Sequence, residues 1–273
     1  GHGVFAIQSP SHRTIDITGR IMSDTFTVTT YNIHKGMSPL NRRVKVNGIA
    51  EALKHLSPDI LMLQEVQGQH LKRTIQFNDF PDQSQHEFFG EFLTLNSSYG
   101  KNAVHPSRHH GNAVLSRFPL DPKHNVNITV NRMEHRGVLH CEVYPPNWTK
   151  PLVILCAHLN LRENDRSKQY QAIHDYVCNT IDPTWPLILG GDFNDWLYHS
   201  DHSIATALGL HEAYVTHNGR LPKTFPAKLP VLSLDRLYVR HLQVVKAVVH
   251  HGQPWSDLSD HLPMSAVLKP DFN

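Results

Sequence analysis

Two short motifs beside apolar stretches carry side chains suited to acid–base and metal chemistry. Gly191-Asp192-Phe193-Asn194 follows the apolar run Leu187–Leu189, and Ser259-Asp260-His261 precedes the apolar run Met264–Leu268. Oxygen-bearing side chains just outside the carboxyl end of a strand lie where α/β sheets bind ligands. Gly-Asp and Asn-Asp are also ordinary turn sequences, so the first motif alone does not distinguish a site from a turn.

Similar side chains occur beside apolar stretches along the whole chain. The residues at or just beyond predicted strand ends are Asn32, Glu65, His158, Asp192, Asn194, Asp235, Asp260 and His261. Only a fold that brings strand ends together would gather them. Carboxylate and amide oxygens without a thiolate cluster suit a hard cation such as Mg²⁺ or Mn²⁺. Histidines beside spare carboxylates suit proton transfer near neutral pH, so the set predicts metal-assisted attack on a phosphate ester.

The elements that must position these residues follow from hydrophobic patterning. Strands are predicted at 26–33, 59–66, 111–119, 125–130, 136–144, 152–159, 187–189, 232–239, 243–250 and 264–268. Helical spacing of apolar residues predicts helices over 41–56 and 163–181 and a short helix near 204–208, whereas 67–96 is expected to be loop plus a short helix. Strands alternating with few helices favour one α/β domain with two packed sheets flanked by helices.

Composition bounds the class of protein. The 273 residues are 40% hydrophobic and 18% charged, as in an ordinary soluble globular domain. The longest apolar run, 152–157, is too short to cross a bilayer. A formal charge of +2 does not indicate a nucleic-acid binder, although protonation of the 22 histidines near about pH 6 would make the surface basic.

The cysteines and the chain ends give further expectations. Cys141, Cys156 and Cys178 lack CxxC spacing, which argues against a disulfide framework and against a thiolate zinc site. We therefore expect a cytoplasmic protein, and we expect it to be a monomer. Residues 1–23 are expected to be an expression tag or a disordered lead, and 24–270 a single catalytic domain.

Eight short motifs occur in a fixed order: Tyr31-Asn32-Ile33, Leu63-Gln64-Glu65, Gly111-Asn-Ala-Val-Leu-Ser-Arg117, His135-Arg136-Gly137, Ala157-His158-Leu159, Gly191-Asp192-Phe193-Asn194, Leu234-Asp235-Arg236 and Ser259-Asp260-His261. In this order they resemble the endonuclease/exonuclease/phosphatase superfamily, metal-dependent phosphohydrolases that include the pancreatic DNase and exonuclease III types. The resemblance covers residues 26–268 and looks closest to small bacterial single-domain members. It implies a four-layer sandwich of two packed, mainly antiparallel β-sheets flanked by helices.

The resemblance also implies roles for the metal and water sites. Glu65 would be the main ligand of Mg²⁺ or Mn²⁺, with Asn32 and Asp260 nearby. Asp192 would orient or deprotonate the attacking water, and Asn194 would donate to a phosphate oxygen.

The remaining roles concern the phosphate and the leaving group. His261 would contact the phosphate or act as a base, held in one tautomer by Asp235. His158 would be the acid for the leaving oxygen or a transition-state donor. Phosphate or substrate contacts are assigned to Arg136, Asn112 and His34.

Two departures from the repair nucleases bear on substrate. His34 stands where that branch has an aspartate, and no Trp-rich motif precedes Asp235. The segment Lys223–Pro230 is instead closer to phosphodiesterase and phosphatase members. These features favour a phosphodiesterase, with a DNA or RNA nuclease as the alternative; lipid, small-molecule and nucleic-acid phosphates all stay open.

Two other classes are disfavoured. A catalytically inactive phosphate-binding module on the same fold conflicts with the absence of any substituted catalytic position. A histidine-rich zinc protein conflicts with the lack of an HExxH motif or a close His/Cys cluster.

Several polar residues have purely structural alternatives. Asp235 could pair only with Arg236, and Arg136 could form a surface ion pair. Arg166 and Gln169, about one turn apart on the predicted helix 163–181, could brace the site or face solvent. Aromatic residues that could rim a pocket or pack in the core are Phe77, Phe80, Phe88, Phe89 and Phe92.

Overall fold

The computed structural model describes residues 24–38, 44–70, 84–105 and 108–271. It also describes two short paired strands, β1 (Ile7–Gln8) and β2 (Thr14–Ile15). Residues 1–23 are expected to be an expression tag or a disordered lead, and all of them except these two strands lie outside the described residues.

The first large sheet has six strands in the order β13-β14-β3-β4-β6-β5. Strands β3 and β4 are parallel, and every other neighbouring pair in this sheet is antiparallel. The strands are β3 (Phe26–Asn32), β4 (Ile60–His70), β5 (Asn96–His105), β6 (Arg108–Ser116), β13 (Leu242–Val249) and β14 (Met264–Pro270).

The second large sheet also has six strands, in the order β11-β12-β10-β9-β8-β7. Here β9 and β10 are parallel and the remaining neighbours are antiparallel. The strands are β7 (Leu120–Asn127), β8 (Gly137–Val143), β9 (Leu152–His158), β10 (Leu187–Asp192), β11 (His211–Glu212) and β12 (Asp235–Arg240).

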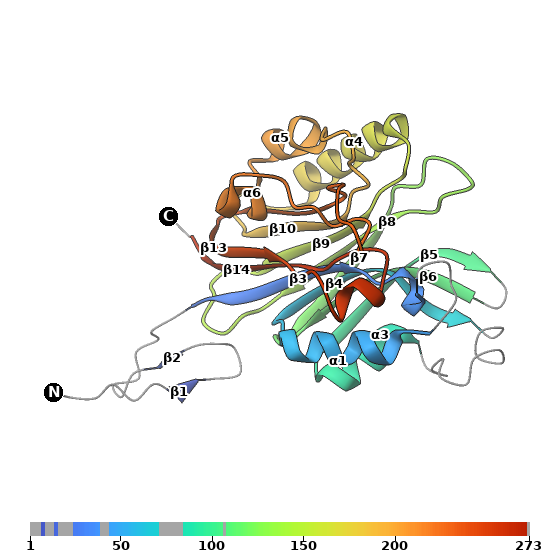
Figure 1. Cartoon of the computed structure of the whole chain (residues 1–273). Coiled ribbons are helices and arrows are strands. Elements are labelled where there is room, and N and C mark those ends of the chain that lie inside the picture. Colours follow the sequence, from blue (N-terminus) through green and yellow to red (C-terminus); the bar gives the residue numbers. More distant parts are fainter. Residues whose placement is uncertain are drawn as a thin grey trace.

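Helices cover the outer face of each sheet, which gives four layers (Figure 1). α1 (Val46–Leu56) and α3 (Gln85–Leu93) lie on the first sheet. α4 (Glu163–Thr180) lies on the second, beside a short π-helix, η3 (Asp201–Ala205), and α5 (Thr206–Leu208). The shorter elements are α6 (Ala213–Asn218), η1 (His34–Gly36) and η4 (Trp255–Asp257). The predicted four-layer α/β sandwich is therefore confirmed.

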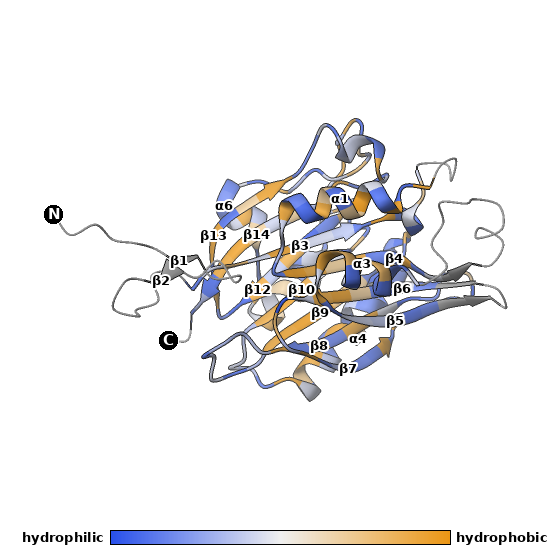
Figure 2. Ribbon diagram, turned by 90° about the horizontal axis from the view of Figure 1, so that it is seen from below, coloured by the Kyte–Doolittle hydropathy of each residue, from blue (hydrophilic) through white to orange (hydrophobic). Residues whose placement is uncertain are grey.

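Apolar side chains fill the spaces between these layers. Met62 and Val114 of the first sheet and Ile154 and Ile188 of the second belong to one fully buried cluster between the sheets. Each such side chain contributes about 1.5–3 kcal/mol by leaving water. Both faces of β9 are covered, so all its residues are buried and its sequence is continuously apolar up to His158. Figure 2 shows this apolar character along the central strands.

Three details of the strand prediction are wrong. β5 lies almost entirely between 97 and 110, where no strand is predicted. The successive strands predicted at 111–119, 125–130 and 136–144 suggest one antiparallel set, but β6 belongs to the first sheet and β7 and β8 to the second. Asp235 begins β12 instead of ending a strand, because β12 runs antiparallel to β10.

The position of Glu65 also differs from the prediction. β4 continues to His70, so Glu65 lies inside the strand and not at its end. The pairing of β4 with β6 is irregular between Leu63 and Val66, and Glu65 has a φ of +53° there. A bulge of this kind redirects a side chain out of the regular alternation of a strand.

Candidate active site

Strand register places three of the predicted residues in one row. Asp192, the last residue of β10, is the direct partner of His158 on parallel β9 and of Asp235 on antiparallel β12. Because β12 runs antiparallel to β10, the first residue of β12 lies beside the last residue of β10. The last residue of parallel β9 lies on the other side of β10. The prediction that these side chains converge therefore holds although Asp235 does not end a strand.

The first sheet contributes to this row through Asn32 at the end of β3. Its side-chain Nδ2 donates to Oδ2 of Asp192 at 2.9 Å. Its Oδ1 accepts from the backbone N–H of His34 at 3.0 Å, and its carbonyl accepts from the Ser259 hydroxyl at 2.7 Å. Asn32 thus joins the two sheets and the segment that carries His261.

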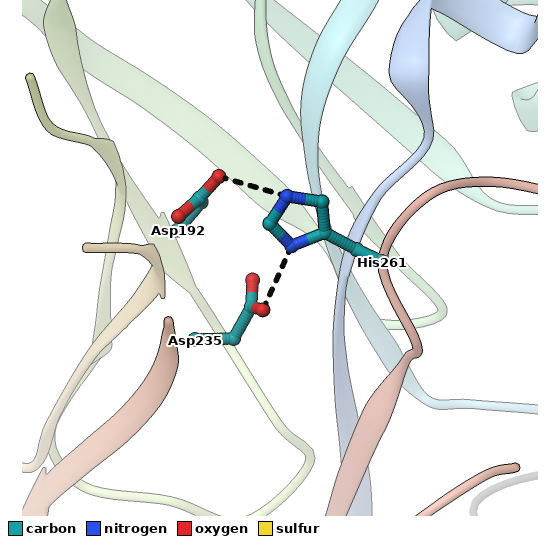
Figure 3. A group of neighbouring side chains, drawn as sticks. All are labelled: Asp192, Asp235 and His261. Atoms are coloured by element: carbon teal, nitrogen blue, oxygen red, sulfur yellow. Dashed lines mark hydrogen bonds and ion pairs between the residues drawn. The ribbon is translucent and has the colours of Figure 1, made fainter. Parts of the chain in front are cut away.

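His261 lies between two carboxylates (Figure 3). Nδ1 is 2.9 Å from Oδ2 of Asp235, and Nε2 is 3.4 Å from Oδ2 of Asp192. The Thr224 hydroxyl donates to the same oxygen of Asp235. Burial acts to lower the pKa of His261, but Asp235, Asp192 and Asp260 together hold that pKa well above its usual value. The three carboxylates therefore favour the protonated form of the ring.

His158 contacts the same carboxylate in the opposite protonation state. Its Nε2 is 3.4 Å from Oδ2 of Asp192. Burial, together with the positive charges of Arg136 and His261, holds the pKa of His158 well below its usual value against the opposing effect of Glu65. One carboxylate therefore faces a neutral imidazole and an imidazolium.

Asp192 has the environment of a proton acceptor. Burial raises the pKa of its carboxyl group, and Asp235 raises it further. The positive charge of His261 and the hydrogen bonds from Asn32 and from the backbone N–H of Asn194, at 3.0 Å, oppose this rise without cancelling it. A carboxylate whose pKa is raised toward neutrality accepts a proton from water more readily than an exposed one.

Glu65 has the charge state that a cation requires. Burial alone would raise its pKa, but His158, Lys35, His34 and a hydrogen bond from Asn32 lower that pKa to about 2. A buried, ionised carboxylate is a fitting ligand for Mg²⁺ or Mn²⁺.

Two neighbours of Glu65 are also predicted metal ligands. Asp260 offers a further carboxylate, and its Oδ2 lies 3.4 Å from Nδ1 of His34. Asn32 directs its amide N–H groups at Glu65 and Asp192. In this arrangement Asn32 orients the two carboxylates instead of presenting its oxygen. The donor set thus fits a hard cation at Glu65 and Asp260.

Among the described residues, Asp192, Asp235 and His261 also form a cluster whose ligand atoms lie within 4.8 Å of one another. Both ring nitrogens of His261 already face carboxylates, and the ring is protonated. Because a metal-bound histidine must offer a lone pair, this cluster is better suited to proton transfer than to holding a cation.

A cavity of about 500 Å³ opens onto these groups. Seven of its lining residues are polar: Glu65, Arg136, His158, Asp192, Asn194, Asp260 and His261. The other five are apolar: Leu161, Trp196, Phe225, Leu232 and Leu234. The apolar part of the lining was not predicted, although Trp196 lies only two residues after the Gly191–Asn194 motif.

Three predicted substrate contacts have particular surroundings. Asn112 is fully buried, and its amide donates to the carbonyls of Gly137 and Cys156 at 2.9 and 3.1 Å. It links β6 to the second sheet and is not part of the cavity lining. Arg136 does line the cavity, and it also pairs with Glu134 at 3.3 Å. Nδ1 of His34 lies 3.4 Å from Oδ2 of Asp260, which is a predicted metal ligand.

Contacts in the structure distinguish between the alternatives stated above for the polar and aromatic residues. Arg236 pairs with Asp195 at 3.4 Å, which leaves Asp235 to His261. Arg166 and Gln169 are fully buried and bond to the segment after His158, so a solvent-facing role for them is wrong. Arg117 forms an ion pair with Asp59 at 3.0 Å, and the three cysteines are free. Phe88, Phe89 and Phe92 pack under the first sheet, whereas Phe77 and Phe80 lie outside the described residues.

Comparisons with known proteins identify the family of the chain. The model of the Endonuclease/Exonuclease/phosphatase family matches residues 29–261. An Escherichia coli K12 protein named uncharacterized protein YbhP is 39% identical over 244 residues, which cover 89% of this chain and 96% of that protein. A Bacteroides vulgatus endonuclease/exonuclease/phosphatase structure superposes with a TM-score of 0.71 at 16% identity, covering 91% of this chain and 100% of that one. A humanized D. rerio TDP2 structure gives 0.66 at 14% identity, covering 90% and 100%.

Proposed function

Because the chain belongs to the endonuclease/exonuclease/phosphatase family, we propose that it is a Mg²⁺- or Mn²⁺-dependent phosphodiesterase. Membership makes it a phosphoric ester hydrolase. The observation that supports the finer proposal is the row of His158, Asp192 and Asp235, closed by His261 and facing the same cavity as Glu65.

Each polar residue around the cavity has a role in this proposal. A divalent cation at Glu65 and Asp260 would supply Lewis-acid stabilisation of the phosphate oxygens. Asp192 accepts the proton of the attacking water, since burial raises its pKa and Asn32 fixes one of its oxygens. His261, held as a cation by Asp235, stabilises the negative charge that grows on the phosphate.

His158 and Asn194 complete the proposed transition-state contacts. The neutral ring of His158 fits a hydrogen-bond donor to phosphate oxygen better than a proton donor to the leaving group. The Nδ2 of Asn194 donates to the Leu159 carbonyl at 2.7 Å, which fixes the amide beside Asp192 and leaves its second N–H for the phosphate.

The choice of a diester rests on the two kinds of residue that line the cavity. The polar residues would hold one phosphate, with Arg136 and His261 as its cations. The apolar residues, which include Trp196 and Phe225, line the same space and would contact the ester substituents. A phosphate monoester lacks the second substituent, so it would use this apolar surface less fully.

The test is a hydrolysis assay with and without chelator, Mg²⁺ and Mn²⁺. Substrates are bis(p-nitrophenyl) phosphate, p-nitrophenyl phosphate, a glycerophosphodiester, plasmid DNA and single-stranded RNA. We expect the aryl diester to be cleaved faster than the monoester, only with metal, and not by His261→Ala. Preferential plasmid or RNA cleavage would instead support the nuclease alternative, and activity that persists with chelator would contradict the metal assignment.

A further inference from the structure

Exposed apolar side chains concentrate at the mouth of the cavity. Large hydrophobic residues with high exposure among the described residues are Met133, Tyr144, Leu161, Trp196, Leu197, Tyr198, Leu229, Val231 and Val245. All of them except Tyr144 and Val245 lie on loops near the cavity. Single exposed hydrophobic residues are normal, but a group around one opening indicates a binding surface.

Contacts place three of these loops at the opening. Leu161 and Trp196 line the cavity, and Leu197 and Tyr198 directly follow Trp196. Phe225 and Leu232 also line it, and their backbones pair with each other. The loop that they close, 226–231, therefore carries its exposed apolar residues at the edge of the cavity.

A fourth loop, between β7 and β8, carries Met133, whose exposed fraction is 90%. The Asn131 amide donates to Asp165 at 2.9 Å, and Glu134 accepts from the Leu161 backbone at 3.3 Å. These bonds hold the loop against the segment that follows His158. In Figure 1 the loop projects beyond the strand ends.

A lysine or arginine adjoins an exposed apolar residue in three of these four loops. The pairs are Arg132-Met133, Leu161-Arg162 and Lys228-Leu229. Among the described residues, Arg132 and Arg162 have no carboxylate partner, and the Lys228 amine is 3.5 Å from Asp257. The nearby carboxylates Glu134 and Glu163 are occupied by Arg136 and Arg166. The mouth therefore combines apolar tips with unneutralised positive charge.

We infer that this mouth docks on an anionic phospholipid surface. Met133, Leu161 and Leu229 would enter the boundary between headgroups and acyl chains, while Arg132 and Arg162 remain at the level of the lipid phosphates. Trp196 has the amphipathic ring that favours this boundary. The inference goes beyond the proposed function, because docking requires no turnover.

The aliphatic tips distinguish this surface from one for nucleic acid. Single-stranded nucleic acid is held by aromatic rings that stack on bases and by a continuous basic groove. The exposed aliphatic side chains of Met133, Leu161, Leu229 and Val231 have no flat face for stacking. Burial in acyl chains uses such side chains fully.

The test is vesicle co-sedimentation of the full chain without added substrate. Vesicles of phosphatidylcholine alone are compared with vesicles of phosphatidylcholine and phosphatidylglycerol. We expect binding to the mixed vesicles only. The double variant Met133→Ser/Leu229→Ser should bind about tenfold or more weakly, since both side chains lose their apolar burial. Arg132→Gln/Arg162→Gln should bind more weakly to mixed vesicles and show less dependence on salt.

The matched control is Tyr144→Ser/Val245→Ser, which removes two exposed hydrophobic residues that do not line the cavity. It should bind as the parent protein does. Met133→Ser/Leu229→Ser should keep the parent turnover of bis(p-nitrophenyl) phosphate, which separates this inference from the proposed function. Equal binding by this variant would overturn the inference. Two other results would also overturn it. In the first, Met133→Ser/Leu229→Ser loses affinity for single-stranded DNA but not for vesicles. In the second, the parent protein sediments as a dimer and this variant as a monomer.

Discussion

Replacing Asp235 with asparagine removes one negative charge 2.9 Å from Nδ1 of His261 and nearly preserves the shape of the side chain. The Thr224 hydroxyl can still donate to the remaining amide oxygen. A buried hydrogen bond to a charged group contributes about 1.5–3 kcal/mol, and one pKa unit corresponds to about 1.4 kcal/mol. The pKa of His261 should therefore fall, because the carboxylate that does most to raise it has lost its charge.

The sign of the effect on activity follows from the role of the cation. His261 is active when protonated, and its pKa is raised, so activity is lost as pH rises through that pKa. In Asp235→Asn this alkaline loss should begin at a lower pH than in the parent protein, with up to about 1.5–3 kcal/mol less stabilisation of the cation. The acidic limb reports the ionisation of Asp192 and should lie above the usual carboxylate range, because burial raises the pKa of that group.

The assay is kcat/KM for bis(p-nitrophenyl) phosphate against pH, together with an NMR titration of the His261 ring. Asp257→Asn is the control, since it removes the same charge from an exposed side chain paired with Lys228. It should leave both limbs in place. At neutral pH, Asp235→Asn should keep more activity than His261→Ala. If the two variants were equally inactive at every pH, Asp235 would have a direct chemical role and this reasoning would fail.

Other predictions concern the metal, the sheet packing and the substrate. Glu65→Gln should sharply weaken Mg²⁺ and Mn²⁺ binding in calorimetry, whereas Glu142→Gln should not; unchanged binding would place the metal elsewhere. Asn112→Ala should lower the free energy of unfolding by about 1–3 kcal/mol, because two buried carbonyls lose their donor, and denaturant titration measures this. His34→Asp should change relative rates among phosphodiesters while leaving the thermal midpoint nearly constant; a large drop in the midpoint would make the residue structural. Turnover should change less than about tenfold between about 50 and 200 mM salt, and a steep slope with plasmid nicking would indicate a nuclease.

The buried strands could be predicted because their sequences have one interpretation. β9 and β10 are apolar on both faces, and each strand ends at a polar residue, His158 in β9 and Asp192 in β10. β5 could not be found in this way. Its first residues, Asn96, Ser97 and Ser98, are polar and half-buried or exposed, since β5 lies at the edge of its sheet. Edge strands have one hydrogen-bonded neighbour and need little apolar character.

The sequence indicated which residues would form the site, but not which partners each of them would contact. Residue types at strand ends indicated that His158 and Asp192 would meet. The same pattern could not show that Arg236 turns to Asp195, because that choice depends on packing between distant segments. It also could not show the apolar part of the cavity lining: Trp196 and Phe225 look like ordinary core or surface residues until the loops that carry them are placed.

The position of β14 has a consequence for how the enzyme is made. Among the described strands this one comes last in sequence, yet it lies between β13 and β3, next to the strand that carries Asn32. His261 comes only three residues before it. A chain emerging from the ribosome therefore has neither a complete first sheet nor His261 until β14 has been synthesised. The nascent chain should be inactive up to that point, and cleavage of phosphate esters should begin only after β14 has inserted.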